Sequence, residues 1–411
     1  MTGEVKRARR SLAIAALTLT VQNGIVMAFG VLYLPLVAEF GGSRAQVAAV
    51  QSLLFVLGGF SGPLIGYALD RLGPRRLFQG GALLAAGGLA AASFATALPA
   101  LFLTYGLAAG LGLAALGSQP NMVVAALWYP RARGKAIAVA DLGTGFGAFV
   151  FVPLAQILVE RFGWRTTLLI WAALLIALVI PNAFQRVPAN GRASEPGPPG
   201  ENARNHWTLA GAIRSSAFWW LVLLRFFSGV SFPLMNVHMV AFAVGAGVSP
   251  MTAAGALGSV SLVSLAGRLV TGWLADRIGR ARALSLTYGS AATGVALLSL
   301  LTLTGWPVWL LAYVLFYGMA QGSGGIVSSA RAADIFAGRS FATIYGWIVL
   351  GTGPGEALGV WAGGAIYDLA GSYLWAFLLV VVGLGLGVLA IWQVRPSDRL
   401  RTARSGGRQG L

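Results

Sequence analysis

Cysteine is absent from the 411-residue chain, and histidine occurs only twice. Without thiols the chain can form neither a disulfide nor a thiolate metal site. His206 and His238 are too far apart in the sequence to make a zinc motif. We therefore expect no metal site and no other cofactor.

Charged residues are scarce as well, at 10% of the chain, whereas 57% of the residues are hydrophobic. This composition indicates a membrane protein. A helix needs about 20 residues to cross the apolar core of a bilayer. Twelve stretches are long and apolar enough: 12–37, 45–69, 77–97, 99–127, 135–159, 165–184, 217–245, 252–275, 282–304, 307–330, 340–366 and 371–393. The sequence predicts an all-α membrane protein with twelve transmembrane helices.

The net charge of +17 could indicate nucleic-acid binding, but the positions of the basic residues favour another interpretation. Most Lys and Arg residues lie before the first span, in alternate connections and in the tail. Only Arg44, Arg161 and Arg165 fall in the other set of connections. By the positive-inside rule, both termini face the cytoplasm. We expect a multi-pass protein of the cell membrane, a bacterial cytoplasmic membrane, whose partner is the lipid bilayer and not a nucleic acid.

A segment rich in Pro, Gly and charge interrupts the apolar pattern in the middle of the chain. It divides the sequence into a first bundle over 11–186, a cytoplasmic linker over 187–214, a second bundle over 215–394 and a basic cytoplasmic tail over 395–411. The stretches "LGTGFGAF" (142–149) and "GTGPGEALG" (351–359) do not lie between a strand and a soluble helix, so they do not predict a nucleotide site. We expect them to allow close helix packing, with Pro354 as a kink.

The two halves carry an internal repeat, "GYALDRLGPRR" (66–76) after the second span and "GWLADRIGRAR" (272–282) after the eighth. In each, the glycine would allow close helix approach, and the aspartate at a helix end could pair with an arginine. The repeat predicts a conformational latch, although an ordinary basic loop is an alternative. The latch residues are Gly66, Asp70, Arg71, Gly73, Arg75, Gly272, Asp276, Arg277, Gly279 and Arg280.

This signature resembles that of the major facilitator superfamily, and the resemblance covers essentially the whole chain. It implies two pseudo-symmetric six-helix bundles with a central substrate site that opens alternately to each side. A finer resemblance is to the prokaryotic branch of monocarboxylate-transporter-like proteins and oxalate–formate antiporters. The matching stretches are "WYPRARGKAIAVADLGTG" (128–145), "VHMVAF" (237–242), "AGRLVTGWLADRIGR" (266–280) and "GGAIYDLAGSY" (363–373).

In that branch an arginine of span eight receives the substrate carboxylate, and Arg268 occupies the corresponding position. Some members add a lysine in span eleven for a second carboxylate. That lysine is missing here, because the chain's lysines are Lys6 and Lys135, and its absence argues against a dicarboxylate such as oxalate.

The position of Arg268 also suggests a functional role independently of any resemblance. At about 1.5 Å per residue it lies roughly 12 Å from the membrane surface near Asp276. A charge deep in the bilayer costs about 2.5–3.5 kcal/mol, so it should be paired or face a wet cavity. Its planar fork of donors suits a carboxylate. The structural alternative is a permanent ion pair that joins helices.

Further polar residues lie within the predicted spans. Asp141 has a depth similar to that of Arg268, and we expect the two to pair when the site is empty; a static pair of Asp141 with Arg225 or with a backbone donor is the alternative. The candidates for proton coupling or gating are Asp141, Glu356, Arg225 and His238. The candidates for substrate binding are Arg268, Asn121, Tyr317, Tyr313 and Tyr33. For the tyrosines, buried packing is the competing explanation.

The sequence thus predicts a secondary transporter, not an enzyme, that works as a monomer. It would move a small organic anion, with a monocarboxylate as first expectation, together with protons or in exchange for another anion. A proton-driven drug or cation exporter remains an alternative, as does a membrane sensor that binds a metabolite without moving it. Substrate identity, direction and stoichiometry stay open.

Overall fold

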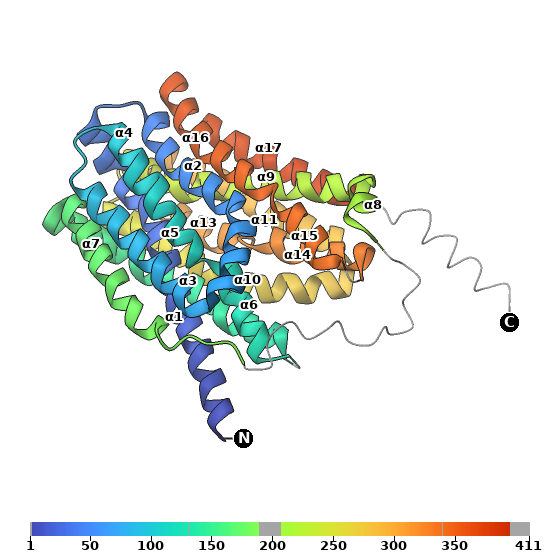
Figure 1. Ribbon diagram of the computed structural model, residues 1–411. Helices are drawn as coiled ribbons and strands as arrows, with labels where there is room; N and C mark the ends of the chain where they lie inside the picture. Colours follow the sequence, from blue (N-terminus) through green and yellow to red (C-terminus); the bar gives the residue numbers. More distant parts are fainter. Residues whose placement is uncertain (1, 131, 189–206, 339, 395–411) are drawn as a thin grey trace.

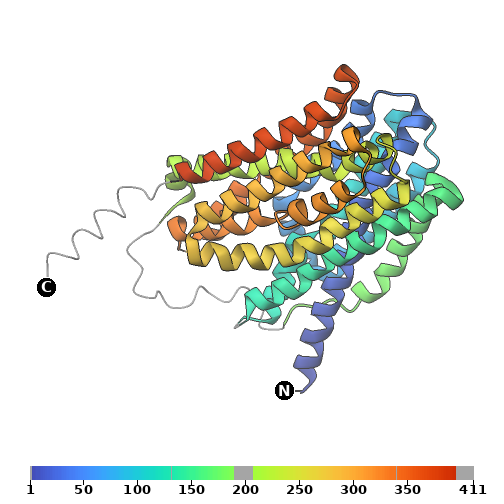
Figure 2. The same ribbon diagram turned by 180° about the vertical axis from the view of Figure 1, so that it is seen from behind.

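The computed structural model describes residues 2–130, 132–188, 207–338 and 340–394. These residues are almost entirely helical, and none of them forms a strand. The helices of the first half, blue to green, gather on one side, and those of the second half, yellow to red, on the other (Figures 1 and 2). The predicted basic tail over 395–411 lies outside the described residues, as does most of the predicted linker.

The first half contains the first six predicted spans. Its elements are α1 (Thr2–Phe40), α2 (Arg44–Phe60), α3 (Gly62–Ser93), α4 (Leu98–Leu101), the π-helical η1 (Phe102–Ala109), α5 (Gly110–Ala115), α6 (Ser118–Trp128) and α7 (Arg133–Asn182). Two of these helices are divided by a glycine with positive φ, Gly73 in α3 and Gly163 in α7, both at 77°. Because L side chains rarely adopt this conformation, glycine is what lets the chain turn there.

The second half contains the other six predicted spans. Its elements are α8 (Leu209–Ile213), α9 (Ser216–Gly245), α10 (Pro250–Ile278), α11 (Arg280–Ser299), α12 (Leu301–Thr304), α13 (Val308–Gly318), α14 (Ser323–Phe336), α15 (Phe341–Val349), α16 (Thr352–Ala370) and α17 (Leu374–Gln393). The expected kink near Pro354 is a helix break at residues 350–351, and Pro354 lies in the first turn of α16. A proline fits there because the first turn needs no intrahelical N–H donor.

Eight of the described helices are long and apolar enough to cross a membrane, and the α2–α3 pair, bent by 57°, adds a ninth. All twelve predicted stretches nevertheless lie on helices. The 50-residue α7 holds two of them on either side of Gly163, and α2 with α3 holds two more. The break between α15 and α16 divides the predicted stretch over 340–366 between two helices. The chain is therefore a multi-pass membrane protein, as predicted.

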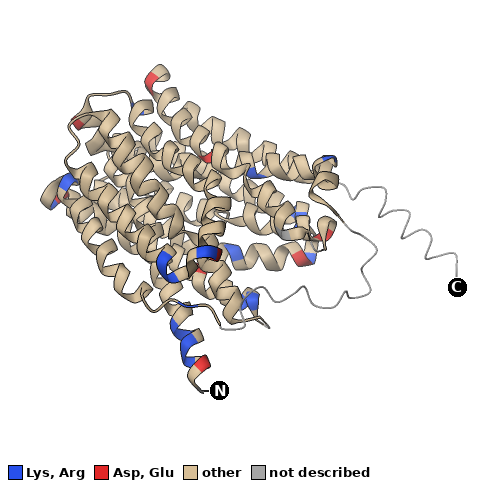
Figure 3. Ribbon diagram, in the orientation of Figure 1, with Lys and Arg blue, Asp and Glu red and all other residues tan. Residues whose placement is uncertain are grey.

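Close contacts at glycines hold the helices of each half together. A Cβ atom on Gly143 or Gly147 of α7 would collide with the backbone of α1, at Ala16 and Thr20. Small residues at such crossings let helix backbones approach in an apolar solvent. The two halves meet along α2–α16, α7–α10 and α1–α9. Most of the helical surface lacks charge (Figure 3).

Candidate functional site

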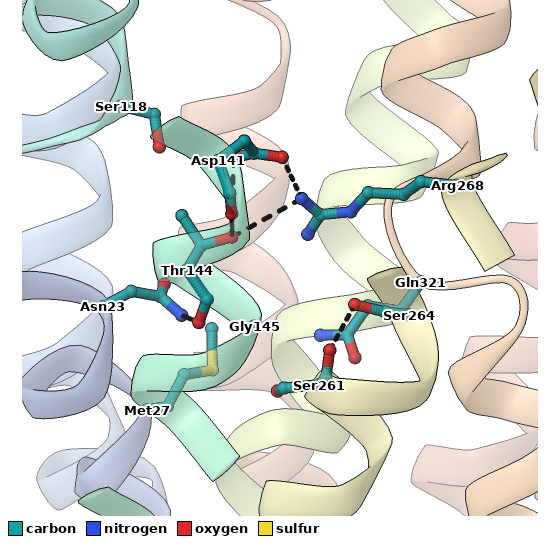
Figure 4. Close-up of a pocket in the computed structure, with 10 residues that line it drawn as sticks. All are labelled: Asn23, Met27, Ser118, Asp141, Thr144, Gly145, Ser261, Ser264, Arg268 and Gln321. Atoms are coloured by element: carbon teal, nitrogen blue, oxygen red, sulfur yellow. Dashed lines mark hydrogen bonds and ion pairs between the residues drawn. The ribbon is translucent and has the colours of Figure 1, made fainter. Parts of the chain in front are cut away.

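A cavity of about 160 Å³ lies where helices of the two halves face each other (Figure 4). Its lining comes from α1, α6 and α7 of the first half and from α10 and the α13–α14 break of the second half. The lining residues are Asn23, Met27, Ser118, Asp141, Thr144, Gly145, Ser261, Ser264, Arg268 and Gln321. Polar side chains from both halves therefore converge on one cavity between them.

An ion pair across the two halves is the main feature of this cavity. Arg268 of α10 donates through Nη1 to the Asp141 carboxylate of α7, and the two side chains are 26% and 22% exposed. The same Nη1 lies 3.4 Å from Thr144 Oγ1. Figure 4 shows both side chains directed toward each other across the cavity. The structure thus brings together the two charges expected to pair from the sequence.

The backbone of the α13–α14 connection covers the other side of the guanidinium. Gly322 has a φ of 90°, and a Cβ atom there would lie 2.6 Å from Arg268 Nε. Among the described residues, Nε has no hydrogen-bond partner. The edge formed by Nη1 and Nη2 is therefore the one through which Arg268 can meet a ligand.

Several residues that line the cavity were not predicted from the sequence as site residues. Asn23 Nδ2 donates to Thr144 O at 2.7 Å, and Gln321 Nε2 donates to Asn236 Oδ1 at 3.2 Å. Ser261 and Ser264 precede Arg268 by seven and four residues, so all three lie on one face of α10. That spacing of polar residues within an apolar span was the available signal.

The other predicted substrate-binding residues lie away from this lining. Asn121 Nδ2 donates to the carbonyl oxygens of Leu116 and Gly117, at 2.8 and 2.9 Å, and the residue is fully buried. Tyr313 and Tyr317 stack on each other with ring centroids 4.8 Å apart, both fully buried. The tyrosine contacts match the packing alternative, and a role in binding stays a prediction for all three residues.

The remaining gating candidates fall into two places. Arg225 Nε donates to Thr352 Oγ1 at 3.0 Å. Thr352 lies in α16, one helical turn before Glu356. His238 lies beside Tyr33, with ring centroids 5.0 Å apart, near the end where α1 meets α2. The lining of the Arg268 cavity includes none of the gating candidates Arg225, Glu356 and His238, and it does not include Tyr33, which was predicted to bind substrate.

The two copies of the repeat share a backbone turn. Gly73 has φ 77° and ψ 164°, and Gly279 has φ 93° and ψ 154°. In the second copy Arg280 pairs with Asp276 and lies 3.5 Å from Asp334. One expectation was wrong: Gly66 and Gly272 do not mediate close helix approach, because a Cβ atom on either would meet no described atom within 4 Å. Arg71 and Arg277 lie over the rings of Tyr67 and Trp273, and the latch role stays a prediction.

Residues 12–330 match the family model of the Major Facilitator Superfamily. The chain belongs to the major facilitator superfamily. This membership agrees with the two-bundle fold and the cavity between the bundles. The chain is a transporter of this superfamily and not an enzyme.

Several relatives of known type support the assignment. The chain is 29% identical over 369 residues to monocarboxylate transporter 13 of Bos taurus, covering 89% of this chain and 84% of that protein. It is 30% identical over 370 residues to monocarboxylate transporter 13 of Rattus norvegicus, with the same coverage. The expected kinship with monocarboxylate transporters is confirmed.

Solved structures share the fold. A bacterial homolog of the human lysosomal transporter Spinster superposes with a TM-score of 0.72 at 17% identity, covering 93% of this chain and 97% of that one. A nucleoside transporter superposes with a TM-score of 0.71 at 16% identity, covering 94% and 98%. At these identities the likeness concerns the major facilitator fold alone.

Proposed function

We propose that this chain carries a small monocarboxylate across the cell membrane by alternating access, with the carboxylate bound by Arg268. The observation that carries the proposal is the Arg268–Asp141 pair in a polar cavity between the two bundles. The names of the relatives, which are monocarboxylate transporters, support the same substrate class. A guanidinium edge binds a carboxylate through two parallel hydrogen bonds.

The same pair supplies a reason for proton coupling. Arg268 and Asp141 together have no net charge, so a bound anion would leave the cavity with one uncompensated negative charge. Such a charge inside the membrane is costly. The substrate carboxylate takes the place of Asp141 on the Nη1–Nη2 edge, and Asp141 then accepts a proton. Anion and proton enter together, and the cavity stays neutral. Exchange of one anion for another follows from the same site when the proton is not released.

The test is uptake by the purified protein in liposomes. Labelled lactate, pyruvate, formate and oxalate are offered with and without an imposed pH gradient, and the best substrate is repeated with Arg268→Lys. We expect uptake to fall roughly tenfold or more, because lysine keeps the charge but cannot form the two parallel hydrogen bonds of a guanidinium with a carboxylate. Arg165→Lys is the matched control, since Arg165 pairs with Glu39 outside the cavity and should leave uptake unchanged. Full uptake by Arg268→Lys would exclude the two-bond carboxylate site, and binding without any accumulation would favour the sensor alternative.

A further inference from the structure

The two bundles are also joined at the end of the molecule opposite the start of α1, which we call the far end. The contacts there involve Tyr33 and Arg44 of the first bundle and His238, Asp368 and Tyr373 of the second, here named the far-end cluster. None of these residues lines the Arg268 cavity. The cluster is therefore spatially separate from the proposed substrate site.

Asp368, near the end of α16, caps the first turn of α2 from the opposite bundle. Its Oδ1 accepts from the Arg44 backbone N–H at 2.9 Å and its Oδ2 from the Ala45 N–H at 2.8 Å. The third N–H of the turn, from Gln46, donates to Ser43 Oγ at 3.2 Å. A helix start needs such acceptors, and a negative charge stabilises it. The helix thus depends on the other bundle for two of its first three acceptors.

The Arg44 side chain adds a second link between the bundles. Its guanidinium carbon lies 3.5 Å from the ring centre of Tyr367, and Nη1 donates to Tyr373 Oη at 2.7 Å. A cation over an aromatic face is attracted to the ring. The backbones touch as well, because a Cβ atom on Gly364 would lie 2.7 Å from the backbone of Arg44. The start of α2 therefore rests directly on α16.

His238 and Tyr33 close the layer behind these contacts. His238 Nε2 lies 2.8 Å from the carbonyl oxygen of Val360, which ties the ring to α16. Tyr33 meets this ring edge-on across the interface and donates its hydroxyl to Arg44 O at 2.9 Å. Both residues are fully buried. At the far end the interface between the bundles thus contains buried aromatic rings together with the hydrogen bonds of Arg44 and Asp368.

The geometry points to a far-end gate in which the hydrogen bonds of Asp368 to the start of α2 hold the two bundles together. Opening this end moves α16 away from α2, which removes both acceptors from the helix start and takes Arg44 off its aromatic ring. These contacts exist only in the closed state, so they shift the equilibrium between the two states by their own free energy. The role goes beyond the proposed substrate site and does not depend on which solute is carried.

The test measures the gate without any substrate. Because the chain has no cysteine, Ala38→Cys and Leu369→Cys can carry spin labels at the far end without background, and both positions are exposed. Pulsed electron spin resonance on the labelled protein in lipid nanodiscs reports the distance between α1 and α16. In the parent we expect one short distance. In Asp368→Asn we expect a second, longer distance, with the open-to-closed ratio raised about fivefold.

Two further variants make the result decisive. Tyr373→Phe keeps the ring but loses the hydroxyl that accepts from Arg44, and should shift the ratio in the same direction by less. Arg165→Gln breaks a surface ion pair within the first bundle and should leave the distances unchanged. Unchanged distances in both Asp368→Asn and Tyr373→Phe overturn the gate, as does an equal shift in Arg165→Gln. If Asp368→Asn does not yield folded protein, Tyr373→Phe alone decides. A lack of transport activity would not affect this measurement.

Discussion

At the scale of single residues, three neighbours fix the guanidinium of Arg268. Asp141 and Thr144 hold one terminal nitrogen, and the backbone at Gly322 covers Nε. The arginine is thereby aimed at the other bundle instead of toward the membrane surface, where a long basic side chain would otherwise extend.

The role of Gly322 leads to the first prediction. In Gly322→Ala the new methyl group would lie 2.6 Å from Arg268 Nε and push the guanidinium out of line with the cavity. We expect the KM for the transported anion to rise about tenfold. Transport kinetics in liposomes measure this effect. Gly305→Ala is the control, because Gly305 also has a positive φ, at 67°, but has open space around it. An equal KM in the two variants would show that the Gly322 contact does not position Arg268.

A second prediction concerns the charge balance of the cavity. In Asp141→Asn the site holds one positive charge when empty and none when an anion is bound, so it no longer needs a proton. We expect exchange of labelled for unlabelled anion to persist, while accumulation driven by a pH gradient disappears. Glu160→Gln, whose carboxylate accepts from Gln156 at 2.9 Å outside the cavity, should keep both activities. Retained pH-driven accumulation in Asp141→Asn would place the proton elsewhere.

The sequence could predict only part of this site. Arg268 and Asp141 were visible because a charge within an apolar span is rare and must have a partner. Gln321 and Ser261 were not, because polar residues of this kind also serve in ordinary helix packing. For the tyrosines of α13 the sequence left two explanations open, since a phenol can line a pocket or pack in a core; Tyr313 and Tyr317 are fully buried against each other, and a role in binding stays a prediction.

At the scale of helices, the fold depends on breaks as much as on spans. The interruption at residues 319–322 between α13 and α14 places Gln321 at the cavity and Gly322 against the side chain of Arg268. Broken helices of this kind are common at transporter sites because backbone groups can be exposed where they line a cavity. Hydropathy predicted the span over 307–330 but not its break, where the backbone of Met319 lies against Gly267 of α10.

The packing of α1 on α7 leads to a third prediction. Gly147 allows this crossing, because a Cβ atom there would collide with the backbone of Thr20. Gly147→Val should force the helices apart and cost about 1–3 kcal/mol of stability, which appears as a lower Tm in detergent. Gly80→Val is the matched control, since Gly80 is an exposed helical glycine with open space around it. Equal melting temperatures for the two variants would rule out the tight crossing as a stabilising contact.

At the scale of the whole molecule, the central linker and the internal repeat were enough to predict two halves of six spans each, and the resemblance to the major facilitator superfamily implied two bundles. The far-end cluster could not be predicted in the same way. Its main link joins Arg44 to Asp368 over 324 residues of sequence, and neither residue stands out on its own. Both lie at predicted span ends, where charged residues are ordinary. Only the packing of α2 on α16 makes them partners.

The final prediction concerns the orientation of the whole chain in the membrane. Basic residues are concentrated at the start of α1 and in the repeat loops, so these segments should face the cytoplasm and the far end the outside. The absence of cysteine allows a direct test with single substitutions at two exposed positions, Gly3→Cys near the start of α1 and Leu369→Cys at the far end, where the leucine is 90% exposed. A membrane-impermeant maleimide should label Leu369→Cys in right-side-out vesicles and Gly3→Cys only in inside-out vesicles. The opposite labelling pattern would reverse the orientation and place the proposed gate on the cytoplasmic side. Labelling of both positions from the same side would contradict the odd number of membrane crossings that we predict between the start of α1 and the end of α16.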